Sequence, residues 1–254
     1  MARSHKYPAF VLLAFLPFDE FPSLAWQPSV SVRITIEHNE ASLVTGELAE
    51  QLLKQNDDVA ARVRGFDLAG NEGSSKTAAL REAFMPMMEK CLHITIHAGE
   101  TQEVQSVWEA VYHLSAERVG HGLTLKDDSA LMEKFKDRNI AIEMCPSSNF
   151  QIVGFQDRFL PSTAFRKVYP LKEYLDQGLR VTVNSDNPGI SRTDFASELH
   201  KAARMTPGGL SLWEICLLIK NGFRSSFAKR QDRHAMLLKA EAEILSFIEE
   251  GLPV

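Results

Sequence analysis

The sequence has few cysteines, and none of them are spaced for a metal cage. Cys91, Cys145 and Cys216 form an odd set without a Cys-x-x-Cys motif. A disulfide framework and a cysteine-built zinc site are therefore disfavoured. A reducing, cytoplasmic location is the simpler interpretation.

No apolar run in the N-terminal part is long enough for a membrane span. The run Ala9–Phe18 is too short, because a bilayer takes about 20 apolar residues. Basic residues precede this run and Ser23-Leu24-Ala25 follows it, which is typical of a secretory signal. Asp19 and Glu20 interrupt that pattern. We favour a buried strand or an irregular segment over residues 1–29 and keep secretion as the alternative.

The sequence also lacks an excess of positive charge. Its net charge is −5, and Lys and Arg are scattered, so nucleic acid and anionic membranes are poor first partners. The composition is that of a globular protein, with 44% hydrophobic and 24% charged residues. No repeat, low-complexity tract or Gly/Ser linker divides the chain. We expect a single domain over residues 1–254.

What the sequence does contain is an alternation of short apolar strands with amphipathic helices. Six segments are predicted strands: Val30–Ile36, Ala60–Asp67, Leu92–His97, Arg118–Gly120, Ile140–Met144 and Arg180–Asn184. Phe10–Leu16 is a possible seventh. Helical spacing covers Val104–Val111, Leu212–Lys220 and Asp232–Glu249. This alternation predicts parallel strands in a barrel or an open sheet, and the missing Gly-x-Gly-x-x-Gly disfavours a dinucleotide-binding sheet.

Polar residues that can do chemistry follow the ends of these strands. They are Asp67 with Gly70, His97 with Glu100, His121, Ser147 with Ser148, and Asp186. Because the carboxyl ends of parallel strands meet on one face, these side chains are expected to converge on one site.

The segment Leu92–Glu100 has the residue types of a metal hydrolase. His93 and His97 lie about 13 Å apart on a strand and cannot bind one ion together. His97 is the better ligand, and Gly99 permits a turn that brings Glu100 back over the site. Zinc hydrolases combine such a histidine with a carboxylate that moves protons.

Five segments, in this order, resemble the adenosine deaminase family of zinc aminohydrolases. They are Asp67–Glu72, His97–Glu100, Arg118–Gly122, Cys145–Asn149 and Asn184–Pro188. The resemblance covers residues 30–254 and leaves 1–29 divergent. It implies an α/β fold, a (β/α)8 TIM-type barrel of the metal-dependent hydrolase kind, incomplete at the N-terminus and with extra C-terminal helices.

The resemblance also implies a reaction and roles for single residues. The reaction is zinc-dependent deamination of adenosine to inosine, with a small purine nucleoside as the partner molecule. His97 and Asp186 would bind Zn2+. Glu100 would protonate the purine N1, and His121 would orient the attacking water and help to deprotonate it. Substrate contacts would come from Gly70, Asn187, which would face the purine N7, and Asp67.

The sequence departs from the family at two places. Members of the family open with a His-x-His strand that supplies two further zinc ligands, and no His-x-His occurs in this sequence. Asn187 stands where many members have an aspartate, but its NH2 group can still donate to N7. Two alternatives therefore stay open. One is an inactive purine-binding or interaction homologue, and the other is a deaminase of adenine, AMP or a modified adenosine. The sequence leaves the oligomeric state undetermined.

Overall fold

Six parallel strands form the sheet of this protein. The computed structural model describes residues 32–37, 63–74 and 77–249. The strands are β1 (Val32–Glu37), β2 (Val63–Ala69), β3 (His93–Ala98), β4 (Arg118–His121), β5 (Ala141–Met144) and β6 (Arg180–Val183). Each strand pairs in parallel with the next one in sequence order. This order, with helices between the strands, is that of a (β/α)8 barrel.

All six predicted strands are confirmed, with shifts of up to three residues at their ends. Within the described residues, β1 and β6 are the two edges of the sheet. The candidate seventh strand, Phe10–Leu16, lies outside the described residues.

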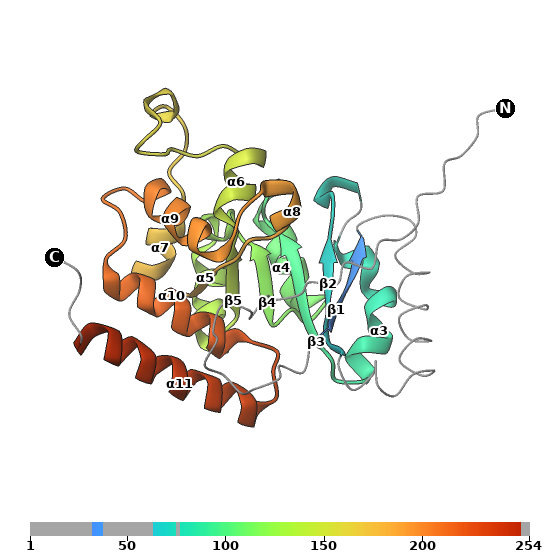
Figure 1. Ribbon diagram of the computed structural model, residues 1–254. Coiled ribbons are helices and arrows are strands. Elements are labelled where there is room, and N and C mark those ends of the chain that lie inside the picture. Colours follow the sequence, from blue (N-terminus) through green and yellow to red (C-terminus); the bar gives the residue numbers. More distant parts are fainter. Residues whose placement is uncertain (1–31, 38–62, 75–76, 250–254) are drawn as a thin grey trace.

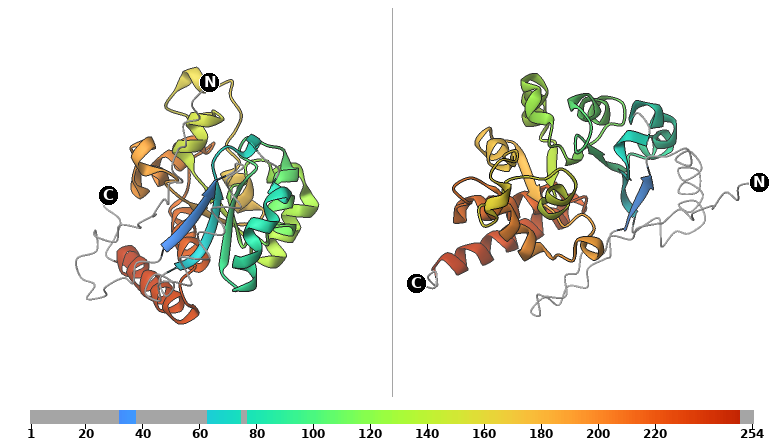
Figure 2. Two further views of the ribbon diagram at one scale, coloured as in Figure 1. Left: turned by 90° about the vertical axis from the view of Figure 1, so that its right-hand side faces the viewer. Right: turned by 90° about the horizontal axis from the view of Figure 1, so that it is seen from above.

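Helices pack along the strands and at both ends of the sheet (Figure 1). They are α3 (Arg81–Glu89), α4 (Val104–Tyr112), α5 (Ser129–Arg138), α6 (Pro146–Ile152), α7 (Leu171–Asp176), α8 (Pro188–Ser191), α9 (Phe195–Met205), α10 (Leu212–Ser225) and α11 (Arg230–Glu249). The view from above shows the chain following a curve from β1 to the red C-terminal helices (Figure 2). The extra C-terminal helices predicted from the sequence are α10 and α11. Among the described helices, none combines the length and the apolar character that a membrane span needs.

The core lies between the strands and the helices that cover them. Strand β5 is buried along its whole length, as expected for a parallel strand covered on both faces. Helix α4 turns Val107, Ala110 and Val111 to the sheet, and this apolar stripe explains why the segment folds as an amphipathic helix.

Helix ends are fixed by side chains that suit them. Asp128 accepts a hydrogen bond from the Leu131 amide at the start of α5, and Ser211 forms a capping box with Glu214 at the start of α10. After β5 the chain turns directly into a helix, because α6 begins at Pro146. Proline is favoured in the first turn of a helix, where its missing N–H costs nothing.

Candidate active site

The carboxyl ends of the strands carry an unusual backbone. His121 and Asp186 have left-handed φ angles of 65° and 56°, which residues other than glycine rarely adopt. Such conformations persist only where the surrounding structure imposes them, and they are concentrated at functional sites. Both residues are at the strand ends where the sequence predicts a site.

The turn after β3 brings Glu100 over the strand ends. Gly99 makes this turn with a φ of 70°. The Glu72 carboxylate then accepts hydrogen bonds from the backbone N–H groups of Glu100, Thr101 and Gln102 at 3.2, 2.8 and 3.0 Å. Glu72 is itself buried. The backbone of Glu100 is therefore held by a carboxylate that comes from the segment after β2.

The Glu100 side chain is largely buried and lies against two polar groups. The Nδ2 amide of Asn149 donates to its Oε1 at 2.9 Å, and Nδ1 of His121 lies 3.3 Å from the same oxygen. Burial raises the pKa of Glu100 to about 7, although the Asn149 hydrogen bond and the charge of His97 lower it. A large fraction of Glu100 is therefore protonated at neutral pH and can act as an acid.

A chain of hydrogen bonds fixes the protons on the two histidines. Oδ1 of Asn149 accepts from the Tyr169 hydroxyl and the Cys145 amide, so its Nδ2 faces His121. His121 Nδ1 must then accept at 2.9 Å, and its Nε2–H donates to Nδ1 of His97 at 3.1 Å. The proton of His97 is therefore on Nε2, which lies 3.5 Å from Asp67. Burial and the charge of His97 lower the pKa of His121, so that His121 is neutral.

The three residues predicted to contact substrate differ in their exposure and in their partners. Asp67 is buried, and its Oδ2 lies 3.5 Å from Nε2 of His97, so it can hold the imidazole in place. Gly70 is exposed and has a φ of 107°. Asn187 uses its Oδ1 to cap α8 by accepting from the Ile190 amide at 3.1 Å. Any contact of Asn187 with a ligand would therefore come from its NH2 group.

The carboxyl ends of the strands, called the rim below, offer nitrogen and oxygen ligands of the kind that zinc takes. Among the described residues, ligand atoms of His121, Cys145 and Asp186 lie within 4.8 Å of one another. His97 is outside that group, although both it and Asp186 act on the pKa of Glu100. Burial raises the pKa of the Cys145 thiol in the metal-free site. The imidazole and carboxylate donors fit a divalent cation.

Sequence reasoning missed three buried residues that organise this rim. Asn149 contacts both Glu100 and His121, Glu72 holds the Glu100 backbone, and Glu198 accepts from the Ser147 amide at 2.9 Å. Asn149 and Glu72 lie within the motifs that carry the family resemblance. Glu198 is on helix α9, far from any motif, and no local pattern marks it.

Fold and site together define a (β/α)-barrel protein with an acid, two histidines and a carboxylate at the carboxyl ends of its strands. A sequence model of the adenosine deaminase family matches residues 28–242. The chain belongs to this family. It is 33% identical over 194 residues to the adenosine deaminase of Escherichia coli strain SE11. The matched segment covers 76% of this chain and 54% of the relative. The chain thus spans about half the length of the curated relatives it matches.

Solved structures agree on the fold. A zinc-bound amidohydrolase from Burkholderia ambifaria superimposes with a TM-score of 0.74 at 18% identity, over 87% of this chain and 58% of the other. The N6-methyl-AMP deaminase of Arabidopsis thaliana gives a TM-score of 0.66 at 21% identity, over 84% and 58%. Both comparisons support the barrel fold predicted from the sequence.

Proposed function

We propose that this protein deaminates adenosine hydrolytically to inosine at the rim formed by Glu100, His97, His121 and Asp186. The observation that carries the proposal is the burial of the Glu100 carboxyl against Asn149 and His121, which raises its pKa to about 7. Family membership supports the same reaction. Deamination needs an acid that protonates the purine ring and a hydroxide that attacks C6.

Glu100 supplies the acid. The Asn149 amide donates to Oε1, which leaves Oε2 to carry the proton toward N1 of the purine. Protonation of N1 draws electrons from C6 and makes this carbon a better electrophile. General acid catalysis of this kind contributes about 10²- to 10⁴-fold in rate.

His121 is suited to handle the proton of the attacking water. It is held neutral by burial. Its Nδ1, which accepts from the Asn149 amide in the substrate-free site, is the nitrogen that can take a proton. Asp67 and His121 contact the two ring nitrogens of His97 in the metal-free site. His97 would hold a zinc ion together with Asp186 by exchanging one of these contacts for the ion. Zinc, when bound, lowers the pKa of water from about 16 to about 7.

The direct test combines metal analysis with an activity assay. The purified chain is incubated with zinc, freed of excess metal and analysed for zinc content and for inosine formation from adenosine. The proposal predicts about one zinc per chain and turnover, both reduced in Asp186→Asn. A chain that stays free of zinc and inert in zinc-replete buffer would instead support an inactive purine-binding homologue.

A second candidate substrate, a purine nucleoside 5′-monophosphate, is favoured by one feature near the rim. A hollow of about 530 Å³ adjoins Ser147 and is lined by the basic residues Arg192, His200, Lys201 and Arg204. Lys201 and Arg204 both pair with Asp157, so Arg192 and His200 would be the main groups for a phosphate. The sequence alone showed no such basic cluster.

A substrate panel separates the two candidates. Ammonia release is measured with adenosine, AMP, N6-methyl-AMP and adenine. A nucleoside enzyme prefers adenosine and is unaffected by Arg192→Gln. An enzyme for monophosphates prefers the nucleotides, and Arg192→Gln raises KM for AMP while KM for adenosine stays unchanged.

A further inference from the structure

A second cavity lies at the opposite end of the strands from the rim. It encloses about 390 Å³ between the amino-terminal ends of β4, β5 and β6 and the segment that joins α10 to α11. Arg118 and Arg180 are the first residues of β4 and β6, whereas His121 and Asp186 follow the other ends of these strands. The cavity is therefore separate from the candidate active site.

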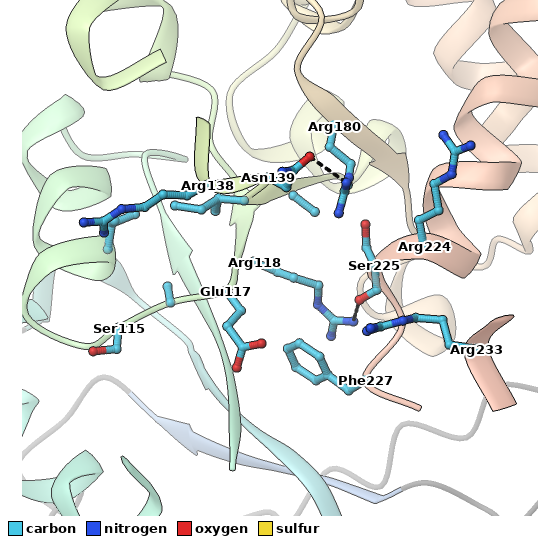
Figure 3. A pocket seen from close by; sticks show the side chains of 14 residues that line it. Ser115, Glu117, Arg118, Arg138, Asn139, Arg180, Arg224, Ser225, Phe227 and Arg233 are labelled. Carbon is cyan, nitrogen blue, oxygen red and sulfur yellow. Dashed lines mark hydrogen bonds between the residues drawn. The ribbon is translucent and has the colours of Figure 1, made fainter. Parts of the chain in front are cut away.

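The lining of this cavity is strongly basic. Five of its lining residues are arginines and one is acidic: Arg118, Arg138, Arg180, Arg224 and Arg233, with Glu117 as the acid. Figure 3 shows Arg118 and Arg233 side by side and Arg180 reaching toward them, while Arg138 points away. Glu117, which contacts His93 at 2.8 Å, and Glu143, which pairs with Arg118, are two carboxylates against five guanidinium groups, so the cavity keeps a positive charge.

Two of these arginines, Arg180 and Arg233, keep N–H donors for a further acceptor. Arg180 donates to Oδ1 of Asn139 at 2.7 Å, and Arg233 donates to the Ser226 carbonyl at 3.1 Å. Neither has a carboxylate partner among the described residues. A guanidinium has five N–H donors, so each of these two groups retains donors for a further acceptor.

Fixed neighbours hold the arginines in place. Arg118 pairs with Glu143 at 2.8 Å, and its guanidinium lies 3.5 Å from the centre of the Phe227 ring. Burial, together with the charges of Arg224 and Arg233, lowers the pKa of Arg180. These like charges repel one another across the cavity, and a bound anion would relieve that repulsion.

We propose that this cavity binds a phosphate group, held mainly by Arg180 and Arg233. The planar fork of arginine matches the geometry of phosphate oxygens, and several such forks around one space are typical of phosphate sites. The volume lies in the range of small-ligand sites, about 300 to 1,000 Å³, so the phosphate fits as free phosphate, pyrophosphate or part of a nucleotide. The site is independent of the proposed deaminase activity.

Titration calorimetry tests the proposal on the full chain at constant ionic strength. The probes are inorganic phosphate, pyrophosphate, AMP and adenosine, and the variants are Arg180→Gln, Arg233→Gln and the control Arg138→Gln. We expect one pyrophosphate per chain. Each of the first two variants should weaken its binding about 10- to 100-fold, the loss expected for one charged hydrogen-bonding group. Arg138→Gln removes the same charge but should leave the affinity near that of the wild type.

The arms of the experiment also distinguish the sources of the phosphate. If AMP binding weakens in the same two variants, the ligand is a nucleotide. If only phosphate and pyrophosphate are affected, it is a free anion, and adenosine should be unaffected in either case. Thermal melts at neutral pH check that each variant is folded. Absence of binding to the wild type at millimolar pyrophosphate, or an equal loss in Arg138→Gln, would overturn the proposal.

Discussion

The buried carboxyl of Glu100 should make the stability of the protein depend on pH. Its pKa is about 7 in the folded protein and about 4.3 in an unfolded chain. The folded state therefore holds the proton more tightly, and the associated stability is present below about pH 4 and lost as pH rises through 7. The loss amounts to about 4 kcal/mol.

The variant Glu100→Gln tests this prediction without any activity assay. The free energy of unfolding of the zinc-stripped variant should exceed that of the zinc-stripped wild type at pH 8 by up to about 4 kcal/mol, and the gap should close near pH 4. Urea titrations at both pH values measure it. Glu103→Gln, an exposed neighbour, is the matched control. A gap that does not change with pH would contradict the buried, protonated state.

The roles of single residues divide into those that sequence can predict and those that it cannot. Four site residues could be predicted because they lie at or after the ends of predicted strands: His97, Glu100, His121 and Asp186. The topology of a parallel sheet alone brings these strand ends together. Asn149 could not be predicted in the same way, because its contact with Glu100 depends on α6 beginning directly at Pro146. The proline at the first helical position suits that start, but it does not show that Asn149 faces Glu100.

At the scale of elements, the loop from Gly99 to Gln102 depends on Glu72. In Glu72→Gln one of the two side-chain oxygens becomes an NH2 group, which cannot accept from the loop N–H groups. We expect a loss of about 1 to 3 kcal/mol in the free energy of unfolding and a fall in kcat, because Glu100 is no longer held. Chemical denaturation and steady-state kinetics measure the two effects. If Glu72→Gln behaves like Glu103→Gln in both measurements, the carboxylate does not hold the loop.

The turn at Gly99 gives a second prediction at this scale. A Cβ atom at Gly99 would lie 2.6 Å from Thr124 Oγ1 and from Val107 Cγ2. At Gly178, which has a similar φ of 76°, nothing lies within 4 Å of a Cβ. Gly178→Ala should therefore cost only backbone strain, about 1 to 2 kcal/mol, and Gly99→Ala about 1 to 3 kcal/mol more from crowding. Equal losses in thermal melts would show that the space around Gly99 is not tight.

At the scale of the whole molecule, the two edges of the sheet predict self-association. The described strands form an open row with β1 and β6 at its edges, and unpaired strand edges favour association with another chain. We expect the purified chain to form dimers or larger species as its concentration rises. Light scattering across a dilution series measures this, and a monomer that stays uniform at high concentration would contradict the prediction.

Much of the architecture could be predicted because it depends on periodicity. Apolar β-branched runs separated by amphipathic helices determine a parallel sheet, and all six strands were found from that pattern. The basic cavity could not be predicted, because Arg118, Arg180 and Arg233 are far apart in sequence. They meet only when α10 packs on β6 and α11 packs on α10. The positive charge of the cavity arises only in the folded protein, because its arginines come from separate segments of the sequence.

The measurement that tests the account most directly is the rate of inosine formation from adenosine by the zinc-loaded chain, compared between wild type and Glu100→Gln. Glutamine keeps the size of the side chain but cannot give a proton to N1. The account predicts turnover by the wild type and a fall in kcat of about 10²- to 10⁴-fold in the variant, with zinc content unchanged. Equal turnover by the two proteins, or no turnover by a fully zinc-loaded wild type, would contradict it.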